Sequence, residues 1–247
     1  GTIVANNVNI SNNGANLSGA RVTDAGSRLI YNGGSITTAG NSNYGIDVYA
    51  QAYVATNNLQ INTSGNGSYG LRVSDKGTSV VANGGAITTT GAGAAGILVR
   101  AGGMVEANNV DINTSGGSAI GAWVAGGESK LKYTGGSITT TGIAYALAAD
   151  NGAQLEASNV IINTSGVNAN GLLASGNSVA VINGTTITTL GDNARGLQAQ
   201  SGSTLSVSDT TISTSGVTAY GVAAATSGKV TATDVSVITT GEGEYQP

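Results

Sequence analysis

The sequence predicts an all-β fold: a right-handed parallel β-helix (solenoid) of about ten coils, each of roughly 25 residues with three short strands. Three observations predict it. An apolar residue, here called the anchor, recurs about every 25 residues; Gly stands four positions after every anchor; and apolar and polar residues alternate within each repeat. The anchors are Ile10, Ile36, Ile61, Ile87, Ile112, Ile138, Ile162, Ile187, Ile212 and Val237. A helical repeat would instead space its apolar residues by three and four.

Each coil is expected to contain three strands, as the middle of the chain illustrates. The first strand, over residues 110–114, holds the anchor. The second follows a Gly and points Ala122 and Val124 inward, and the third does the same with Leu131 and Tyr133. Every strand pairs in parallel with its copy in the next coil, because the rest of the coil provides the crossover that parallel strands need.

The predicted register places charges of opposite sign beside one another. The two columns concerned are Arg21, Asp47 and Arg72 on the second strand and Glu106, Lys132 and Glu156 on the third. Neighbouring strands lie about 4.8 Å apart, so alternating charges stabilise the lateral pairing. The register follows from the anchors alone, so the alternation of charge in these two columns is independent support for the β-helix.

The repeat is written in two alternating versions that conserve core volume. Two positions before the anchor, even coils carry Gly34, Gly85 and Gly136, whereas odd coils carry Val8, Leu59, Val110 and Val160. Five positions before it the sizes are exchanged: even coils carry Tyr31, Tyr133 and Ile182, and odd coils carry Ala5, Thr56, Ala107 and Ala157. Ala82 breaks the pattern, so we expect a gap beside it. Asn residues four positions before the anchor and inward Thr residues two positions after it are expected to form hydrogen bonds along the stack.

Composition excludes several classes of function. The 247 residues include no Cys and no His, only 9% are charged, and the net charge is −4. Nucleic acid is not an expected partner, because no basic stripe is available to neutralise phosphates. The common nucleophile–base pairs and zinc sites are missing, so we expect no enzyme, no catalytic residue and no cofactor. We also expect no metal site; Asp209 and Asp234, in one column of adjacent coils, are the weak candidates for holding a cation.

Two alternatives with this fold stay open. A polysaccharide-acting β-helix enzyme would use clustered acids, whereas the thirteen acids here are scattered. An ice-binding β-helix would present outward Thr-x-Thr pairs such as Thr88 with Thr90 and Thr139 with Thr141, but the coils between them carry Asn and Ser.

The segments "ITTTGAGAAGILV", "INTSGNGSYGLRV" and "ISTSGVTAYGVAA" resemble those of bacterial autotransporter passenger domains, the pertactin-like group of type V secretion. The resemblance implies one β-helix domain over residues 1–247, a fragment of a longer passenger without its signal peptide and C-terminal translocator barrel. It implies an extracellular location at the bacterial cell surface, with membrane contact only through that missing barrel. Adhesion or autoaggregation, often linked to virulence, is the implied activity. Ala146, where other coils have Gly, departs from the repeat.

A stripe of outward residues on the second strand is the predicted binding face. We expect Trp123, Leu98 and Leu173 to form an exposed apolar patch, flanked by Tyr49, Arg72, Arg100 and Asp47. The expected partner is a host surface protein, a host glycan or a second copy of the chain. The leading hypothesis is therefore an adhesin or autoaggregation module, and the alternative is a structural spacer that carries a distal domain.

Overall fold

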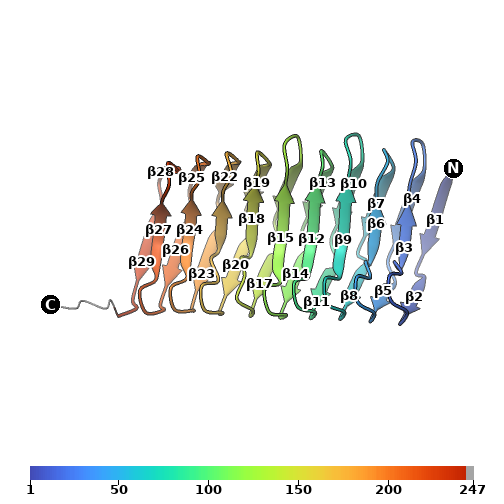
Figure 1. The fold of residues 1–247 in the computed structure, drawn as a ribbon, viewed down its shortest axis with the longest axis horizontal. Helices are drawn as coiled ribbons and strands as arrows, with labels where there is room; N and C mark the ends of the chain where they lie inside the picture. Colours follow the sequence, from blue (N-terminus) through green and yellow to red (C-terminus); the bar gives the residue numbers. More distant parts are fainter. Residues whose placement is uncertain (243–247) are drawn as a thin grey trace.

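The computed structural model describes residues 1–242, which form a right-handed parallel β-helix with the two ends of the chain at opposite ends of a rod (Figure 1). Three parallel sheets run the length of the rod, two of ten strands and one of nine. The predicted fold class is confirmed. Residues 1–242 contain no helix of the length and apolarity that a bilayer crossing requires.

Sheet A is formed by the strands that precede the anchors. It consists of β1 (Thr2–Asn6), β4 (Arg28–Asn32), β7 (Tyr53–Asn57), β10 (Ser79–Asn83), β13 (Met104–Asn108), β16 (Lys130–Thr134), β19 (Gln154–Ser158), β22 (Val179–Asn183), β25 (Thr204–Ser208) and β28 (Lys229–Thr233).

Sheet B is formed by the anchor strands. It consists of β2 (Asn9–Asn12), β5 (Ser35–Thr38), β8 (Gln60–Thr63), β11 (Ala86–Thr89), β14 (Asp111–Thr114), β17 (Ser137–Thr140), β20 (Ile161–Thr164), β23 (Thr186–Thr189), β26 (Thr211–Thr214) and β29 (Ser236–Thr239).

Sheet C is formed by the strands that follow the second Gly of each coil. It consists of β3 (Ala20–Val22), β6 (Ile46–Val48), β9 (Tyr69–Ser74), β12 (Ala95–Arg100), β15 (Ile120–Ala125), β18 (Leu147–Asp150), β21 (Leu172–Ala174), β24 (Arg195–Ala199) and β27 (Tyr220–Ala224).

The ten anchors stand opposite one another in the parallel register of sheet B, as predicted. Those from Ile36 to Ile212 are buried, whereas Ile10 is partly buried and Val237 is 45% exposed. Both exceptions belong to the terminal coils, which have a neighbour on one side only. The core is therefore a continuous column in which each coil covers the next.

The corner between sheets A and B needs a residue with positive φ in every coil. Asn109 (φ 52°) fills it in an odd coil and Gly135 (φ 65°) in the next even one. Three of the five even coils place a second Gly behind it, namely Gly34, Gly85 and Gly136. A Cβ on Gly136 would collide with the carbonyl oxygen of Val110. Tyr133, in the same coil, is fully buried. The predicted exchange of volume between the two coil types is confirmed.

Side chains also bond along the stack, but only on one of the two predicted columns. Asn32 donates from Nδ2 to Asn6 at 2.8 Å, and the ladder continues through Asn57, Asn83 and Asn108. The inward Thr column forms no such ladder. The hydroxyls of Thr38, Thr63, Thr89, Thr140, Thr189 and Thr214 are buried without a hydrogen-bond partner in the described chain. Two others of the column, Thr114 and Thr164, donate instead to backbone carbonyls of their own coils, those of Ala119 and Ala169. The prediction of hydrogen bonds along the stack was therefore wrong for that column.

The gap expected beside Ala82 is present. A small void of about 10 Å³ lies in the core between sheets, lined by Ala82 together with Thr56, Leu59 and Val110 among others. Ala82 occupies the column that Tyr31 and Tyr133 fill in other even coils, so the local loss of volume explains the void.

Candidate functional site

The outward face of sheet C, here called the C face, is built from three columns of side chains. The central column contains Arg21, Asp47, Arg72, Leu98, Trp123, Ala148, Leu173 and Gln198. One flanking column precedes the second Gly of a coil, or Ala146 in its place, and includes Tyr44, Tyr69, Ile120 and Tyr145. The other follows the second inward residue and includes Tyr49, Arg100 and Asp150. Each central side chain is therefore surrounded on four sides.

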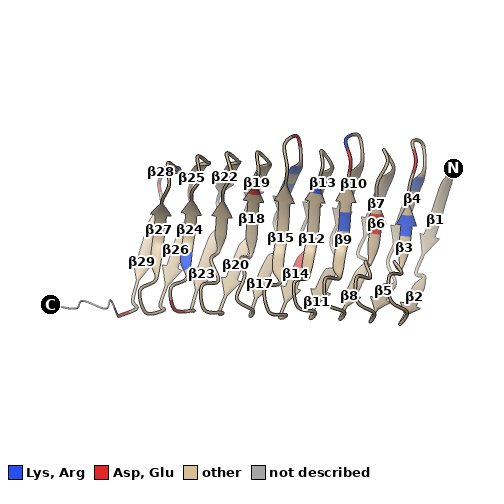
Figure 2. Ribbon diagram, viewed as in Figure 1, with Lys and Arg blue, Asp and Glu red and all other residues tan. Residues whose placement is uncertain are grey.

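Near the N-terminal end, the C face is closed by an ion-pair cluster. Arg72 donates from Nε and Nη2 to the two carboxylate oxygens of Asp47, at 2.7 and 2.9 Å. Its guanidinium lies 4.2 Å from the ring centroid of Tyr44, and that ring stacks on Tyr69 at 5.4 Å. Arg21 approaches the same carboxylate at 3.7 Å. Figure 2 shows the pattern as blue, red and blue patches on β3, β6 and β9.

Two predicted members of the binding face are therefore already engaged within the chain. The Asp47 side chain is fully buried and that of Arg72 is 19% exposed. Burial lowers the pKa of Arg72, but the hydrogen bonds and charge of Asp47 outweigh it and leave that pKa above its usual value. The expectation that both side chains flank an open patch was wrong, because their charges neutralise each other.

The predicted exposure of the apolar stripe is also wrong. Leu98 is 3% and Leu173 is 8% exposed, although both point away from the core. Leu98 lies between Arg72 and Trp123 in the register, and these large neighbours cover it. Period-2 alternation gives the direction of a side chain but not the size of its neighbours, so it could not show this.

Other columns of outward charges behave differently. Glu106, Lys132 and Glu156 stand opposite one another in sheet A as predicted, yet no ion pair of residues 1–242 joins them. Arg100 is exposed and Tyr49 is partly buried beside the Arg21 guanidinium, which is 6.0 Å from its ring centroid. Arg100 thus remains available to a partner, whereas Tyr49 packs against its own chain.

A pocket opens on the C face where the central column changes from Trp to Ala. It has a volume of about 110 Å³ and is lined by Ile120, Trp123, Tyr145, Ala148, Ala149, Asp150, Leu173 and Ser175. Trp123, Ala148 and Leu173 come from the successive strands β15, β18 and β21. Trp123, the chain's only Trp, keeps part of its surface exposed. The structure thus brings Trp123 and Leu173 together around one hollow.

Asp150 stands at one side of this pocket and is held in place by neutral donors. The backbone N–H and Nδ2 of Asn151 donate to its two oxygens at 2.9 and 2.8 Å, and Ser175 donates from Oγ at 2.7 Å. The ion pairs found within residues 1–242 do not include Asp150. Its carboxylate is therefore oriented but not neutralised.

Tyr145 was missed by the sequence reasoning, which followed only residues after the second Gly. It lies in the segment from Gly142 to Ala146, which is one residue shorter than its counterpart from Gly116 to Gly121. Other coils place a residue with positive φ in this segment, such as Ser118, whereas residues 143–146 contain none. The departure from the repeat at Ala146 was visible in the sequence, and it falls beside the pocket.

The two weak metal candidates lie in a turn, away from the C face. Asp209 (φ 48°) and Asp234 (φ 52°) occupy the corner between sheets A and B in adjacent coils. Asp209 accepts a hydrogen bond from Asn183 Nδ2 at 3.1 Å and so extends the Asn ladder. Residues 1–242 contain no group of three or more acidic residues that could hold a metal ion.

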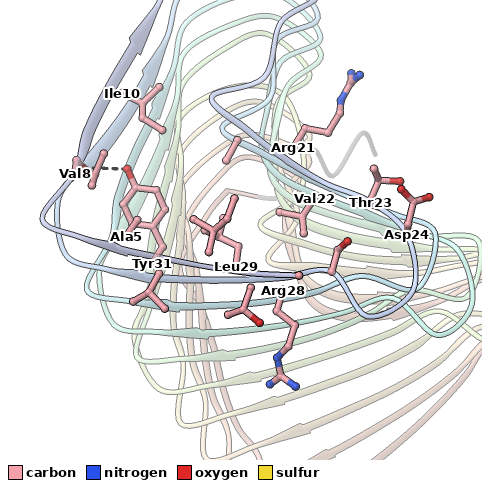
Figure 3. A pocket seen from close by; sticks show the side chains of 16 residues that line it. Ala5, Val8, Ile10, Arg21, Val22, Thr23, Asp24, Arg28, Leu29 and Tyr31 are labelled. Atoms are coloured by element: carbon pink, nitrogen blue, oxygen red, sulfur yellow. Dashed lines mark hydrogen bonds between the residues drawn. The ribbon is translucent and has the colours of Figure 1, made fainter.

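The hollow at the N-terminal end of the rod is the open end of the core rather than a built site. It has a volume of about 840 Å³ at the first coil, and Figure 3 shows Ala5, Val8, Ile10, Leu29 and Tyr31 around it. The same columns are buried in the following coils. Its apolar lining residues are core positions that no preceding coil covers, and Arg21, Asp24 and Arg28 stand among them.

No protein-family model matches the chain, and no curated protein matches it. Its fold is similar to that of Vag8 in the cryo-EM structure of the Vag8–C1 inhibitor complex, with a TM-score of 0.75 and 21% sequence identity. The match covers 98% of this chain and 61% of that chain, so the present chain spans about three fifths of the other's length. At this identity the likeness shows a shared fold.

Proposed function

We propose that the chain is a cell-surface binding module with an adhesin-like role, and that the C face contacts a partner protein. One observation carries the proposal. Most of the central column is packed within the chain, yet Trp123 is left partly exposed beside a pocket. Trp, Tyr and Arg dominate the energetics of protein interfaces, and Tyr145 and Arg100 stand on the same face.

The comparison and the sequence both support this proposal. A protein of the same fold, Vag8, stands in a solved complex with C1 inhibitor, which favours a protein as the partner of this chain over a glycan or a second copy. The resemblance of the coil sequences to autotransporter passengers supports an extracellular location at a bacterial surface. A rod that presents one binding face along its length suits that location.

The proposal includes no catalytic step. The acidic residues are dispersed, and Asp47 and Asp150 on the C face are each fixed by hydrogen bonds within the chain. Incubation with pectins, glycosaminoglycans and esters is expected to release no product. Turnover that a single Asp or Glu substitution abolished would contradict this part of the proposal.

Surface display of the chain on a non-adherent bacterium tests the binding role. Adherence to cultured host cells is expected to exceed that of bare bacteria, and Trp123→Ala is expected to reduce it severalfold. Tyr53→Ala is the matched control, because Tyr53 is a partly buried outward aromatic residue on sheet A. Melting curves of both variants check that the rod stays folded.

The outcomes separate the alternatives. Adherence no higher than that of bare bacteria would contradict the proposal and favour a spacer. Equal loss in both variants would show that the C face is not the contact surface. If the displaying bacteria clump but do not bind host cells, the partner is a second copy of the chain and not a host protein.

A further inference from the structure

We infer that the pocket above Ala148 accepts a basic side chain, Arg or Lys, of the partner protein; this rests on the proposed function and deepens it. The shape of the pocket, its charge and its aromatic lining all favour such a group.

The shape favours an extended side chain. Trp123 and Leu173 lie two strands apart in the central column, roughly 9.6 Å at the strand spacing of about 4.8 Å. Between them Ala148 contributes only a methyl group, which leaves a slot about one strand wide. An aliphatic stem or a guanidinium plane fits a slot of this width.

The charge favours a cation. Asp150 receives its three hydrogen bonds from neutral groups, and no ion pair of the described chain neutralises it. The nearest cation in its own column is Arg100, two coils away and about 10 Å along the stack. A basic group that enters the slot meets a carboxylate that is already fixed in place, so little free energy is needed to reorganise the site.

The aromatic side chains add a second attraction. Trp123 and Tyr145 both line the pocket, and aromatic rings attract cations within about 6 Å of their centroids. The rod contains a related combination in a different layout: Arg72 bonds to Asp47, which is in the central column, and lies 4.2 Å from the ring of Tyr44. The pocket presents Tyr145, in the same column as Tyr44, together with an acid but without an arginine of the chain itself.

The single Trp allows a direct test, because its fluorescence reports on the pocket alone. The probes are end-blocked peptides Gly-Arg-Gly and Gly-Lys-Gly, the neutral isostere Gly-citrulline-Gly, and a methyl hexoside. The basic peptides are expected to change the Trp123 emission saturably, and the citrulline peptide and the sugar are not. Asp150→Asn is expected to weaken peptide binding by about tenfold.

Matched variants separate charge from shape. Asp111→Asn removes an equivalent charge on sheet B, where Ser137 donates to Asp111 at 2.7 Å as Ser175 does to Asp150, and it is expected to leave binding unchanged. Ala148→Leu keeps Asp150 but fills the slot, and it should abolish binding. The fold tolerates Leu in this column at Leu98 and Leu173, and Ala223→Leu is the control outside the pocket.

Three results would overturn the inference: no saturable response to either basic peptide, an equal response to the citrulline peptide, or a response to the sugar alone. The proposed function fails separately. Peptide binding without adherence to host cells would contradict the adhesin role but support the inference about the pocket. Trp123-dependent adherence without peptide binding would support the adhesin role but contradict the inference about the pocket.

Discussion

The phenolic hydroxyl of Tyr133 donates a hydrogen bond to the backbone carbonyl of Val110, one coil earlier in the rod. Gly136 lies against the same carbonyl, where an added Cβ would collide with it. Tyr31 and Val8 repeat the arrangement at 3.0 Å. The alternation between two coil types thus inserts a tyrosine of one coil beneath the main chain of its neighbour.

Alkaline pH is expected to destabilise the rod through these tyrosines. Burial raises the pKa of Tyr133 and of Tyr31 above the usual value near 10. Their contribution to stability is therefore complete below about pH 10 and is lost as pH rises above it, because only the unfolded state ionises readily there. Urea unfolding at increasing pH should show this loss, at most about 1.4 kcal/mol per pH unit for each tyrosine.

Tyr133→Phe should reduce that alkaline slope, at a cost near neutral pH of about 1 kcal/mol for the lost hydrogen bond. Tyr220→Phe is the control, since the Tyr220 side chain is 55% exposed. An unchanged slope in Tyr133→Phe would show that other groups govern the alkaline loss.

Filling the void at Ala82 is expected to stabilise the rod. Ala82→Val adds apolar contacts in a space of about 10 Å³ and should raise the free energy of unfolding by about 1 kcal/mol. Ala107→Val is the matched control in the same column of the next coil, where no void adjoins, and should lower it by about 1–3 kcal/mol. Urea denaturation measures both, and a loss in both variants would mean that the gap cannot take two methyl groups.

Arg72 is expected to matter far more than Arg21, although both approach Asp47. Arg72→Ala removes the bidentate partner of a fully buried carboxylate and should cost about 3 kcal/mol. Arg21→Ala removes a side chain that is 56% exposed at 3.7 Å, so little change is expected. Thermal unfolding compares the stability of the two variants. Equal losses of stability would contradict the conclusion that Arg72 is the main ion-pair partner of Asp47.

The inward Thr column offers a test of buried hydroxyls. Thr89→Val replaces a hydroxyl without a partner by a methyl group and should raise the free energy of unfolding by about 1 kcal/mol. Thr164→Val is expected to lower it by about the same amount, because Thr164 donates from Oγ1 to the carbonyl of Ala169 at 2.7 Å. Chemical denaturation of the pair should give opposite signs, and a loss in Thr89→Val would show that its hydroxyl has a partner.

The sequence by itself determined the solenoid, the parallel register and the inward columns. These features depend on spacing along the chain: an anchor such as Ile112 recurs with a fixed period, and alternation within a strand then assigns each neighbour to the core or to the surface. Even the gap at Ala82 followed from comparing volumes within one column.

Tertiary structure alone decided which outward residues remain accessible. Leu98 and Trp123 have the same outward phase, yet Leu98 is 3% exposed because its neighbours in three columns cover it, whereas Trp123 borders the hollow left by Ala148. Exposure depends on the sizes of side chains from neighbouring coils, about 25 residues apart in the chain. The pairing of Asp47 with Arg72 and the pocket that Tyr145 and Asp150 both line arise from the same lateral packing, which a period along one strand does not encode.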